Sequence, residues 1–360
     1  MTEYDNGDEY WAIQIDELKR RRAFAEEMGG TENVARQHAA GRLTVRERIQ
    51  RITDNRSFRE IGTFAGTGEY DEDLKIKNVV PATYVAGVAR INGRSIAIGG
   101  EDFTVRGGTS FGAQRRKGGQ GGYIEDLAHH YKIPLVNLID GAGGSVSSVK
   151  RRGFVTLPGV DGFERSVQLL GEVPVASAVL GTAAGGPAGR AILSHFSVMV
   201  AGTSQIFAAG PPVVKRSLGQ EISKDALGGA SIAVNKAGAI HNVAETEDDA
   251  FAQVKRFLSF MPQNVWQMPS VLKTDDPVDR RDEDLLGIVP ANRRQTYDMK
   301  ALVQMVVDKG SSFEIRPTYG QAVITMLARL GGRPVGLVAN NPMVYGGAMN
   351  ADAARKQNHF

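Results

Sequence analysis

The chain of 360 residues contains no cysteine, which excludes disulfides, thiolate nucleophiles and cysteine-based zinc sites. Its six histidines lack the spacing of a metal-binding motif such as H-E-x-x-H, so we expect no metal in this chain. No apolar run reaches the ~18 residues that a membrane-spanning helix needs. The N-terminus is acidic, unlike a signal or transit peptide. We therefore expect a cytoplasmic protein with no membrane contact.

Blocks of like charge are also missing. The 43 Lys and Arg residues are interspersed with 40 Asp and Glu residues, so nothing in the sequence indicates a nucleic-acid-binding surface. With 42% hydrophobic residues, a chain of this length buries a large core and is expected to form about two domains.

The order of patterns along the chain predicts an α/β protein. Short apolar runs rich in β-branched residues, such as TYVAGVARI and PLVNLID, alternate with segments of helical periodicity, such as GGYIEDLAHHYK. We divide the chain into a helical arm, a large α/β domain, a charged linker that contains proline, and the start of a further domain, at residues 1–45, 46–265, 266–298 and 299–360.

The sequence repeats itself. Residues Ala89–Gly108 align without a gap with Ala328–Gly347, and Arg48–Ile61 aligns with Leu302–Ile315 with one position of slippage. Two matches in the same order predict a duplicated fold. A second copy as long as the first would extend beyond Phe360, so we expect the chain to carry only the opening of that copy.

Two glycine pairs each follow an apolar run that reads as a strand. The first pair is Gly143 and Gly144. The second, Gly185 and Gly186, precedes Pro187 and a segment to Gly202 that reads as a helix. Free N–H groups at such positions bind anionic oxygens, and two converging loops form an oxyanion hole. Close packing of helices, which also requires glycine, is an equally good interpretation of the local sequence.

Other glycine motifs are absent or weak. The sequence has no G-x-x-x-x-G-K-[ST] phosphate loop and no early G-x-G-x-x-G dinucleotide motif. GTSFG, residues 108–112, fits the G-x-S-x-G nucleophile elbow with Ser110 as nucleophile, but the residues that follow are a poor helix.

Several longer motifs identify a family. The chain resembles the carboxyltransferase (beta) subunits of biotin-dependent acyl-CoA carboxylases, the propionyl-CoA and 3-methylcrotonyl-CoA carboxylase family. The resemblance rests on GRLTVRERI, EDFTVRGGT, LIDGAGG, GTAAGGPAG and FAAGPPVVKRSLGQEISKDALGGA, and on longer segments that follow them. It implies a duplicated crotonase-like (ClpP/crotonase) superhelical fold, with the acyl-CoA on the domain at 46–265 and biotin on the domain that begins at 299.

The resemblance also implies a site. Backbone N–H groups of the loops at Gly143, Gly144, Gly185 and Gly186 bind the thioester oxygen of an acyl-CoA, and carboxyl passes from carboxybiotin to its α (or vinylogous γ) carbon. The expected substrate-binding residues are Gly107, Gly108, Thr109, Pro187, Ala188, Lys150 and Arg151. Lys150 and Arg151 are candidates for the CoA phosphates, although a solvated loop also explains them. Pro187 and Gly189 depart from the family pattern near the acyl group.

The implied partners are a biotin carboxylase or biotin carboxyl carrier subunit and further copies of the chain, as a hexamer built from dimers. The subunit of a biotin-dependent acyl-CoA decarboxylase, which runs the step in reverse, shares these motifs. A non-catalytic scaffold that retains the crotonase fold is a further alternative.

Overall fold

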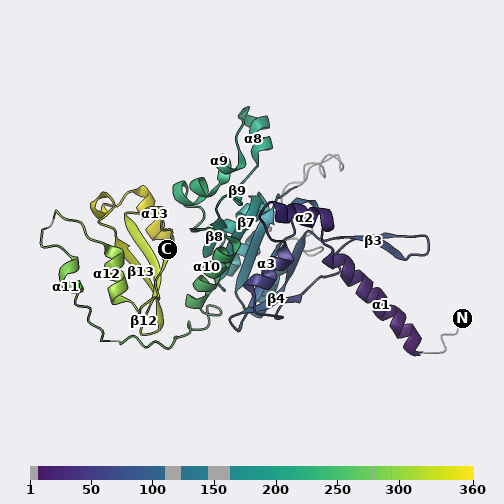
Figure 1. Ribbon diagram of the computed structural model, residues 1–360, viewed down its shortest axis with the longest axis horizontal. Coiled ribbons are helices and arrows are strands. Elements are labelled where there is room, and N and C mark those ends of the chain that lie inside the picture. The colour runs from purple at the N-terminus through teal and green to yellow at the C-terminus, as the bar shows by residue number, and fades with distance from the viewer. Residues whose placement is uncertain (1–6, 110–122, 145–162, 278, 293) are drawn as a thin grey trace.

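The computed structural model describes residues 7–109, 123–144, 163–277, 279–292 and 294–360 (Figure 1). Its centre is a mixed eight-stranded sheet in the order β1-β4-β5-β6-β7-β8-β10, with β9 beside the end of β7. The pairings from β5 through β6, β7 and β8 to β10, and that of β9 with β7, are parallel, whereas the β1–β4 and β4–β5 pairings are antiparallel. The strands are β1 (Arg59–Glu60), β4 (Tyr84–Ile91), β5 (Arg94–Glu101), β6 (Leu135–Gly141), β7 (Val175–Ala184), β8 (Phe196–Val200), β9 (Gln205–Phe207) and β10 (Asn242–Ala244). The predicted α/β class is confirmed.

Helices cover both faces of this sheet. On one face, α3 (Val45–Ile52) and α10 (Glu247–Phe260) pack against alternate residues of the central strands. On the other, α4 (Tyr123–Tyr131) and α6 (Glu164–Leu170) form one core, and α7 (Gly186–Ile192) joins a second core. Because both faces are covered, all ten residues of β7 are buried.

The helix predicted from Gly186 to Gly202 is confirmed for its first part and wrong for its second. Helix α7 ends at Ile192, and Phe196–Val200 forms β8, which pairs with β7. The five residues of β8 are all buried, and a short apolar run covered on both sides is compatible with either strand or helix when its sequence is read alone.

A smaller unit follows the linker. It consists of β11 (Phe313–Ile315), β12 (Val323–Leu330) and β13 (Arg333–Asn340), covered by α12 (Met299–Val306) and α13 (Ala351–His359). It lies at one end of the elongated molecule, and α1 with the β2–β3 hairpin extends from the other (Figure 1). The remaining elements are α1 (Gly7–Glu26), α2 (Thr31–Ala39), β2 (Gly66–Tyr70), β3 (Ile76–Pro81), η1 (Arg106–Gly108), α8 (Pro211–Leu218), α9 (Lys224–Gly228), η3 (Ser231–Lys236), α11 (Leu285–Ile288) and η4 (Tyr345–Gly347). No helix in the described part of the chain is long and apolar enough to cross a membrane.

The internal repeat of the sequence is also a repeat of local structure. The hairpin of β4 and β5 recurs as that of β12 and β13, and η1 recurs as η4, with every element end displaced by the 239 residues that separate Tyr84 from Val323. Upstream, α3 recurs as α12, displaced by the 254 residues that separate Val45 from Met299. This match needs no slippage, contrary to the expectation from sequence. The displacements differ because the β2–β3 hairpin has no counterpart in the second copy.

The repeat extends to individual hydrogen bonds. The Asp54 carboxylate accepts the N–H groups of Asn92 and Gly93 at 2.8 and 2.7 Å, and the Asp308 carboxylate accepts those of Gly331 and Gly332 at 2.8 and 2.6 Å. Likewise, the hydroxyl groups of Ser57 and Ser311 each accept the N–H of an arginine on the neighbouring strand at 3.1 Å (Arg90 and Arg329). Corresponding positions of the two copies can therefore be compared residue by residue.

A buried ionic network joins α3, β6, β7 and α10. The Arg48 guanidinium donates to the Asp140 carboxylate at 2.9 Å, to both oxygens of Glu247 at 2.7 and 2.8 Å, and to the Leu180 carbonyl at 3.1 Å. Arg42 also donates to Asp140 at 3.0 Å. Burial alone would lower the pKa of Arg48, but the two carboxylates raise it above its ordinary value. The Arg48 side chain is 1% exposed, so its charge depends entirely on these partners.

We expect Arg48→Met to lower the free energy of unfolding by about 3–5 kcal/mol, since it leaves two buried carboxylates without their shared cation. The measurement is urea unfolding followed by circular dichroism. Arg51→Ala is the matched control, because the Arg51–Asp248 pair is exposed and should contribute below about 1 kcal/mol. Equal losses in the two variants would contradict this assignment.

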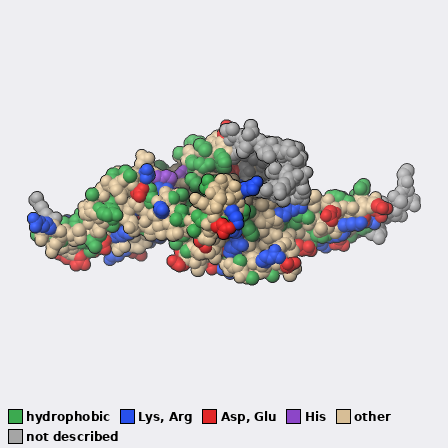
Figure 2. Space-filling model, turned by 90° about the horizontal axis from the view of Figure 1, so that it is seen from above, with side chains coloured by type: hydrophobic (Ala, Val, Ile, Leu, Met, Phe, Trp, Pro, Cys, Tyr) green, Lys and Arg blue, Asp and Glu red, His purple; other side chains and the backbone are tan. Residues whose placement is uncertain are grey.

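Two histidines meet where the small unit contacts the large one, and Figure 2 shows histidine side chains at this junction. The Ser197 N–H donates to His241 Nδ1 at 3.0 Å, so the neutral ring carries its proton on Nε2, which lies 3.0 Å from Nε2 of His359. Burial, followed by the positive charge of Arg316 and by His359, holds the pKa of His241 well below its usual 6.5.

We expect the protein to lose stability as the pH falls through about 6.5. Because the pKa of His241 is depressed in the folded chain, the unfolded chain binds a proton near pH 6.5 that the folded chain does not bind. The free energy of unfolding therefore rises with pH in this range. His241→Asn should flatten the dependence of the unfolding free energy between about pH 5.5 and 7.5. The exposed His130 provides the control variant His130→Gln. An unaltered pH slope in His241→Asn would assign the effect to other groups.

Candidate functional site

Three backbone loops meet at one edge of the central sheet. They follow β5, β6 and β7 and comprise residues 106–109, 142–144 and 185–187. Since these three strands are parallel neighbours, their carboxyl ends share that edge, where ligands of open α/β sheets commonly bind. All of the glycines predicted for the site lie in these loops.

Direct contacts hold the loops together. The Ala142 N–H donates to the Gly107 carbonyl at 3.0 Å. A Cβ at Gly143 would lie 2.4 Å from the Ala184 carbonyl oxygen, and one at Gly108 would lie 2.8 Å from the Asp140 carbonyl oxygen. Glycine at 108 and 143 therefore allows the backbones to approach closely.

The two members of each glycine pair have different roles. Gly143 and Gly185 have φ angles of 74° and 63°, a left-handed conformation that L-residues rarely adopt. Gly144 and Gly186 are exposed, and apart from the chain neighbours no atom of the described residues lies within 4 Å of where their Cβ would be. The first glycine of each pair turns the chain, and the second leaves space in front of the backbone that a side chain would fill.

The N–H groups are not equally available. The Gly185 N–H donates to the Phe207 carbonyl at 3.1 Å, so it is already hydrogen-bonded within the chain. Gly186 is the first residue of α7, and its N–H makes no hydrogen bond to any residue that the structure describes. Of the second glycine pair in the expected oxyanion hole, Gly186 is therefore the member whose N–H group is available to a ligand.

The residues after Gly186 face the protein interior. Pro187 is buried, and Ala188 is 6% exposed in a core that includes Ile139 and Val179. The Ala188 side chain therefore packs in this core, and its role in substrate binding stays a prediction. A Cβ at Gly189 would lie 2.5 Å from the Phe163 ring, so glycine there is explained by packing.

The other predicted residues have varied outcomes. Thr109 is half-buried, and its hydroxyl donates to the Arg106 carbonyl at 2.8 Å, which closes the turn. Lys150, Arg151 and the alternative nucleophile Ser110 lie outside the described residues.

A buried ion pair beneath the loops was not found from sequence. The Glu101 carboxylate at the end of β5 pairs with the Arg190 guanidinium from α7 and also accepts the Asp140 N–H at 3.3 Å. Burial lowers the pKa of Arg190 and raises that of Tyr84, whose ring lies 5.6 Å from the guanidinium. Both charges lie in motifs singled out for their glycines, EDFTVRGG and GPAGR, yet only the fold brings them together.

This arrangement defines a class of site. Its chemistry comes from backbone N–H groups and open space at the ends of parallel strands, which suits a ligand oxygen that gains negative charge during a reaction. Within the described ranges, no group of three or more His, Asp or Glu is arranged to hold a metal.

Comparison with known proteins gives the family. Residues 36–360 match the model of the carboxyl transferase domain, and the chain belongs to this family. It is 32% identical over 349 residues to the methylmalonyl-CoA decarboxylase subunit alpha of Veillonella parvula, and 33% identical over 347 residues to the propionyl-CoA carboxylase beta chain of Roseobacter denitrificans. Each match covers 96% of this chain and 67% of the relative.

Comparison with solved structures gives the same family. The structure of transcarboxylase 12S with methylmalonyl-coenzyme A and methylmalonic acid bound matches 96% of this chain with a TM-score of 0.84 and 31% identity. The match covers 66% of that chain, so the present chain spans about two thirds of the length of these relatives. The similarity confirms the predicted family and the crotonase-like α/β architecture.

Two single substitutions test the different roles of the two glycines in the first pair. We expect Gly143→Ala to destabilise the protein by about 1–3 kcal/mol, because alanine is strained at a positive φ and its methyl group would collide with the Ala184 carbonyl. Gly144→Ala should leave the unfolding free energy nearly unchanged, since, chain neighbours aside, the described residues place no atom within 4 Å of the new methyl group. Thermal unfolding of the two variants tests this, and a larger loss in Gly144→Ala would refute it.

Proposed function

We propose that this chain is a carboxyltransferase subunit that acts on an acyl-CoA thioester. The observation that carries the proposal is the pair of glycines Gly144 and Gly186, which have open space among the described residues. In the same part of the chain the Gly186 N–H has no hydrogen-bond acceptor. The names of its relatives support the substrate class, since they include a propionyl-CoA carboxylase chain and a methylmalonyl-CoA decarboxylase subunit.

In this proposal the backbone binds the thioester oxygen. The Gly186 N–H, at the positive end of α7, donates to that oxygen, and the loop at 142–144 closes the opposite side. Withdrawal of charge onto the oxygen makes the α (or vinylogous γ) carbon nucleophilic as an enolate, which the N–H stabilises more strongly than the neutral thioester.

Biotin on a partner subunit would supply the carboxyl group and a nitrogen able to accept the proton that the substrate carbon loses. The described loops fit the acyl-CoA role, because they provide space and a hydrogen-bond donor where the acyl group would lie. We assign no described side chain as nucleophile or base.

The proposal includes a division of the chain. We assign residues 46–265 to the acyl-CoA side and residues 299–360 to the beginning of the biotin side, joined by the linker at 266–298. We further propose that the protein assembles as a hexamer with a biotin carboxylase or biotin carrier partner. The hexamer assembly of the related transcarboxylase 12S supports this arrangement.

The direction of transfer has a second candidate. A decarboxylase subunit and a carboxylase chain are equally similar to this chain, at 32% and 33% identity over the same share of it. The decarboxylase reaction uses the same enolate in reverse, so the site geometry suits both directions.

We expect Gly186→Val to lower the rate of carboxyl transfer by about two to three orders of magnitude. The valine side chain would fill the space in front of the N–H of residue 186, which is the proposed donor to the thioester oxygen. The assay supplies the biotin-bearing partner and a panel of acetyl-, propionyl- and 3-methylcrotonyl-CoA. Gly287→Val is the matched control, since Gly287 in α11 also has open space around it. Unchanged transfer in Gly186→Val would favour a scaffold that has only kept the fold.

A further inference from the structure

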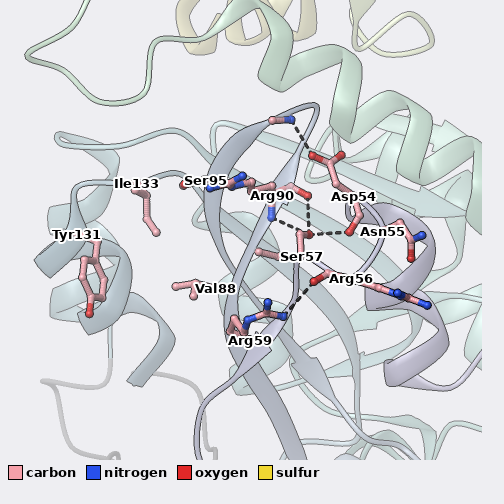
Figure 3. A pocket seen from close by; sticks show the side chains of 12 residues that line it. Asp54, Asn55, Arg56, Ser57, Arg59, Val88, Arg90, Ser95, Tyr131 and Ile133 are labelled. Atoms are coloured by element: carbon pink, nitrogen blue, oxygen red, sulfur yellow. Dashed lines mark hydrogen bonds between the residues drawn. The ribbon is translucent and has the colours of Figure 1, made fainter.

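A separate pocket of about 760 Å³ opens at the other end of the sheet (Figure 3). It lies beside Gly93 and Ser95 at the start of β5 and Ile133 just before β6, whereas the glycine loops follow the carboxyl ends of these strands. Its charged lining includes Arg56, Arg59 and Arg90. The proposed carboxyl transfer does not use it.

The pocket is cationic, and most of its charge is unpaired. The Asp54 carboxylate accepts the N–H groups of the β4–β5 turn, and the Arg59 guanidinium donates to the backbone carbonyls of Arg56 and Phe58 at 3.0 and 3.2 Å. Within the described part of the chain, the guanidinium groups of Arg56 and Arg90 make no hydrogen bond or ion pair. Both are exposed and free to bind a ligand.

The internal repeat shows what such a pocket can hold. The counterpart of Arg90 is Arg329, whose guanidinium donates to the carbonyl of Ser270 in the linker at 3.1 Å. It also donates to the carbonyls of Ser259 in α10 at 2.6 Å and of Gly332 in its own hairpin turn at 2.7 Å. Two residues further along the linker, the Leu272 N–H donates to the Gly332 carbonyl at 3.0 Å. In the second copy, an extended stretch of the linker therefore occupies the position that is open in the first.

The linker also supplies a carboxylate. Asp276 accepts the N–H of Lys309 at 3.0 Å, and Lys309 is the counterpart of Asn55. The contrast in occupancy is clear at the turn glycines. A Cβ on Gly332 would lie 1.8 Å from the Leu272 carbonyl oxygen, whereas one on Gly93 would meet, apart from its chain neighbours, no described atom within 4 Å. The same backbone is thus covered in one copy and bare in the other.

We propose that the pocket at Arg90 binds an extended acidic segment of a partner protein. By analogy with residues 270–276, one backbone carbonyl of the segment accepts from Arg90, a backbone N–H donates to the Gly93 carbonyl, and a carboxylate accepts the Asn55 N–H. Arg56 and Arg59 replace Gly310 and Phe313 of the second copy. These two additional cations favour a segment with more acidic residues than the linker has.

The test uses a fluorescently labelled peptide with the sequence of Pro269–Asp279, which includes the residues Ser270, Leu272 and Asp276 that contact the second copy. Fluorescence anisotropy with the full chain should show saturable binding, and Arg90→Ala should weaken it at least about tenfold through loss of a charge-assisted hydrogen bond. Arg216→Ala, which removes an exposed arginine of α8, is the matched control and should bind as the unaltered chain does. A peptide with Asp276→Asn should bind more weakly.

Four outcomes would overturn the proposal. The first is that the peptide does not bind at millimolar concentration, and the second is that Arg90→Ala and the unaltered chain bind it equally. The third is displacement of the peptide by an equal concentration of inorganic phosphate or free glutamate, because that result would indicate a small-anion site. The fourth is a change in the chain's own sedimentation coefficient on Arg90→Ala, which would make a second copy the occupant. Circular dichroism of Arg90→Ala confirms that the variant is folded.

Discussion

The edge of the sheet that carries the glycine loops depends on the interactions of the Arg48 guanidinium. Reaching from α3, it binds the carboxylate that ends β6, a carbonyl of β7 and the carboxylate that begins α10. A planar group with five donors satisfies all of these at once, as a lysine could not. Because an unpaired buried charge is costly, the four elements cannot shift independently. Asp140 lies just before the loop at 142–144, so the same network fixes where that loop leaves the sheet.

The candidate site is made by backbone conformation more than by side chains. Gly143 and Gly185 have positive φ angles, and the absence of a Cβ at Gly143 lets its loop approach the Ala184 carbonyl. The next residue of each pair has open space among the described residues. The nearby charges of Glu101 and Arg190 pair with each other beneath the loops, so they hold the loops in place without adding net charge. This suits the proposed reaction, in which negative charge develops on the bound thioester and the transferred group arrives from another subunit.

The repeat shows how one supersecondary unit serves two purposes. Both copies have a hairpin whose turn is held by an aspartate, Asp54 in one and Asp308 in the other. In the second copy the linker crosses the hairpin, and Arg329 is buried beneath it at 5% exposure. In the first copy the corresponding Arg90 remains in contact with solvent. The difference lies in what the rest of the chain brings to the hairpin, since the hairpins themselves are closely alike.

The sequence by itself determined the features that depend on neighbouring residues. Apolar runs predicted the main strands, the glycine pairs predicted loops at strand ends, and the match between Ala89–Gly108 and Ala328–Gly347 predicted the repeated hairpin. Only the tertiary structure decided that the segment after Ile192 is a strand, that the Gly185 N–H is already bonded, and that Ala188 faces the core. It alone joined Arg48 to Asp140 and Glu247, which lie 92 and 199 residues away. Local patterns specify elements, whereas the partners of buried polar groups are set by which elements pack together.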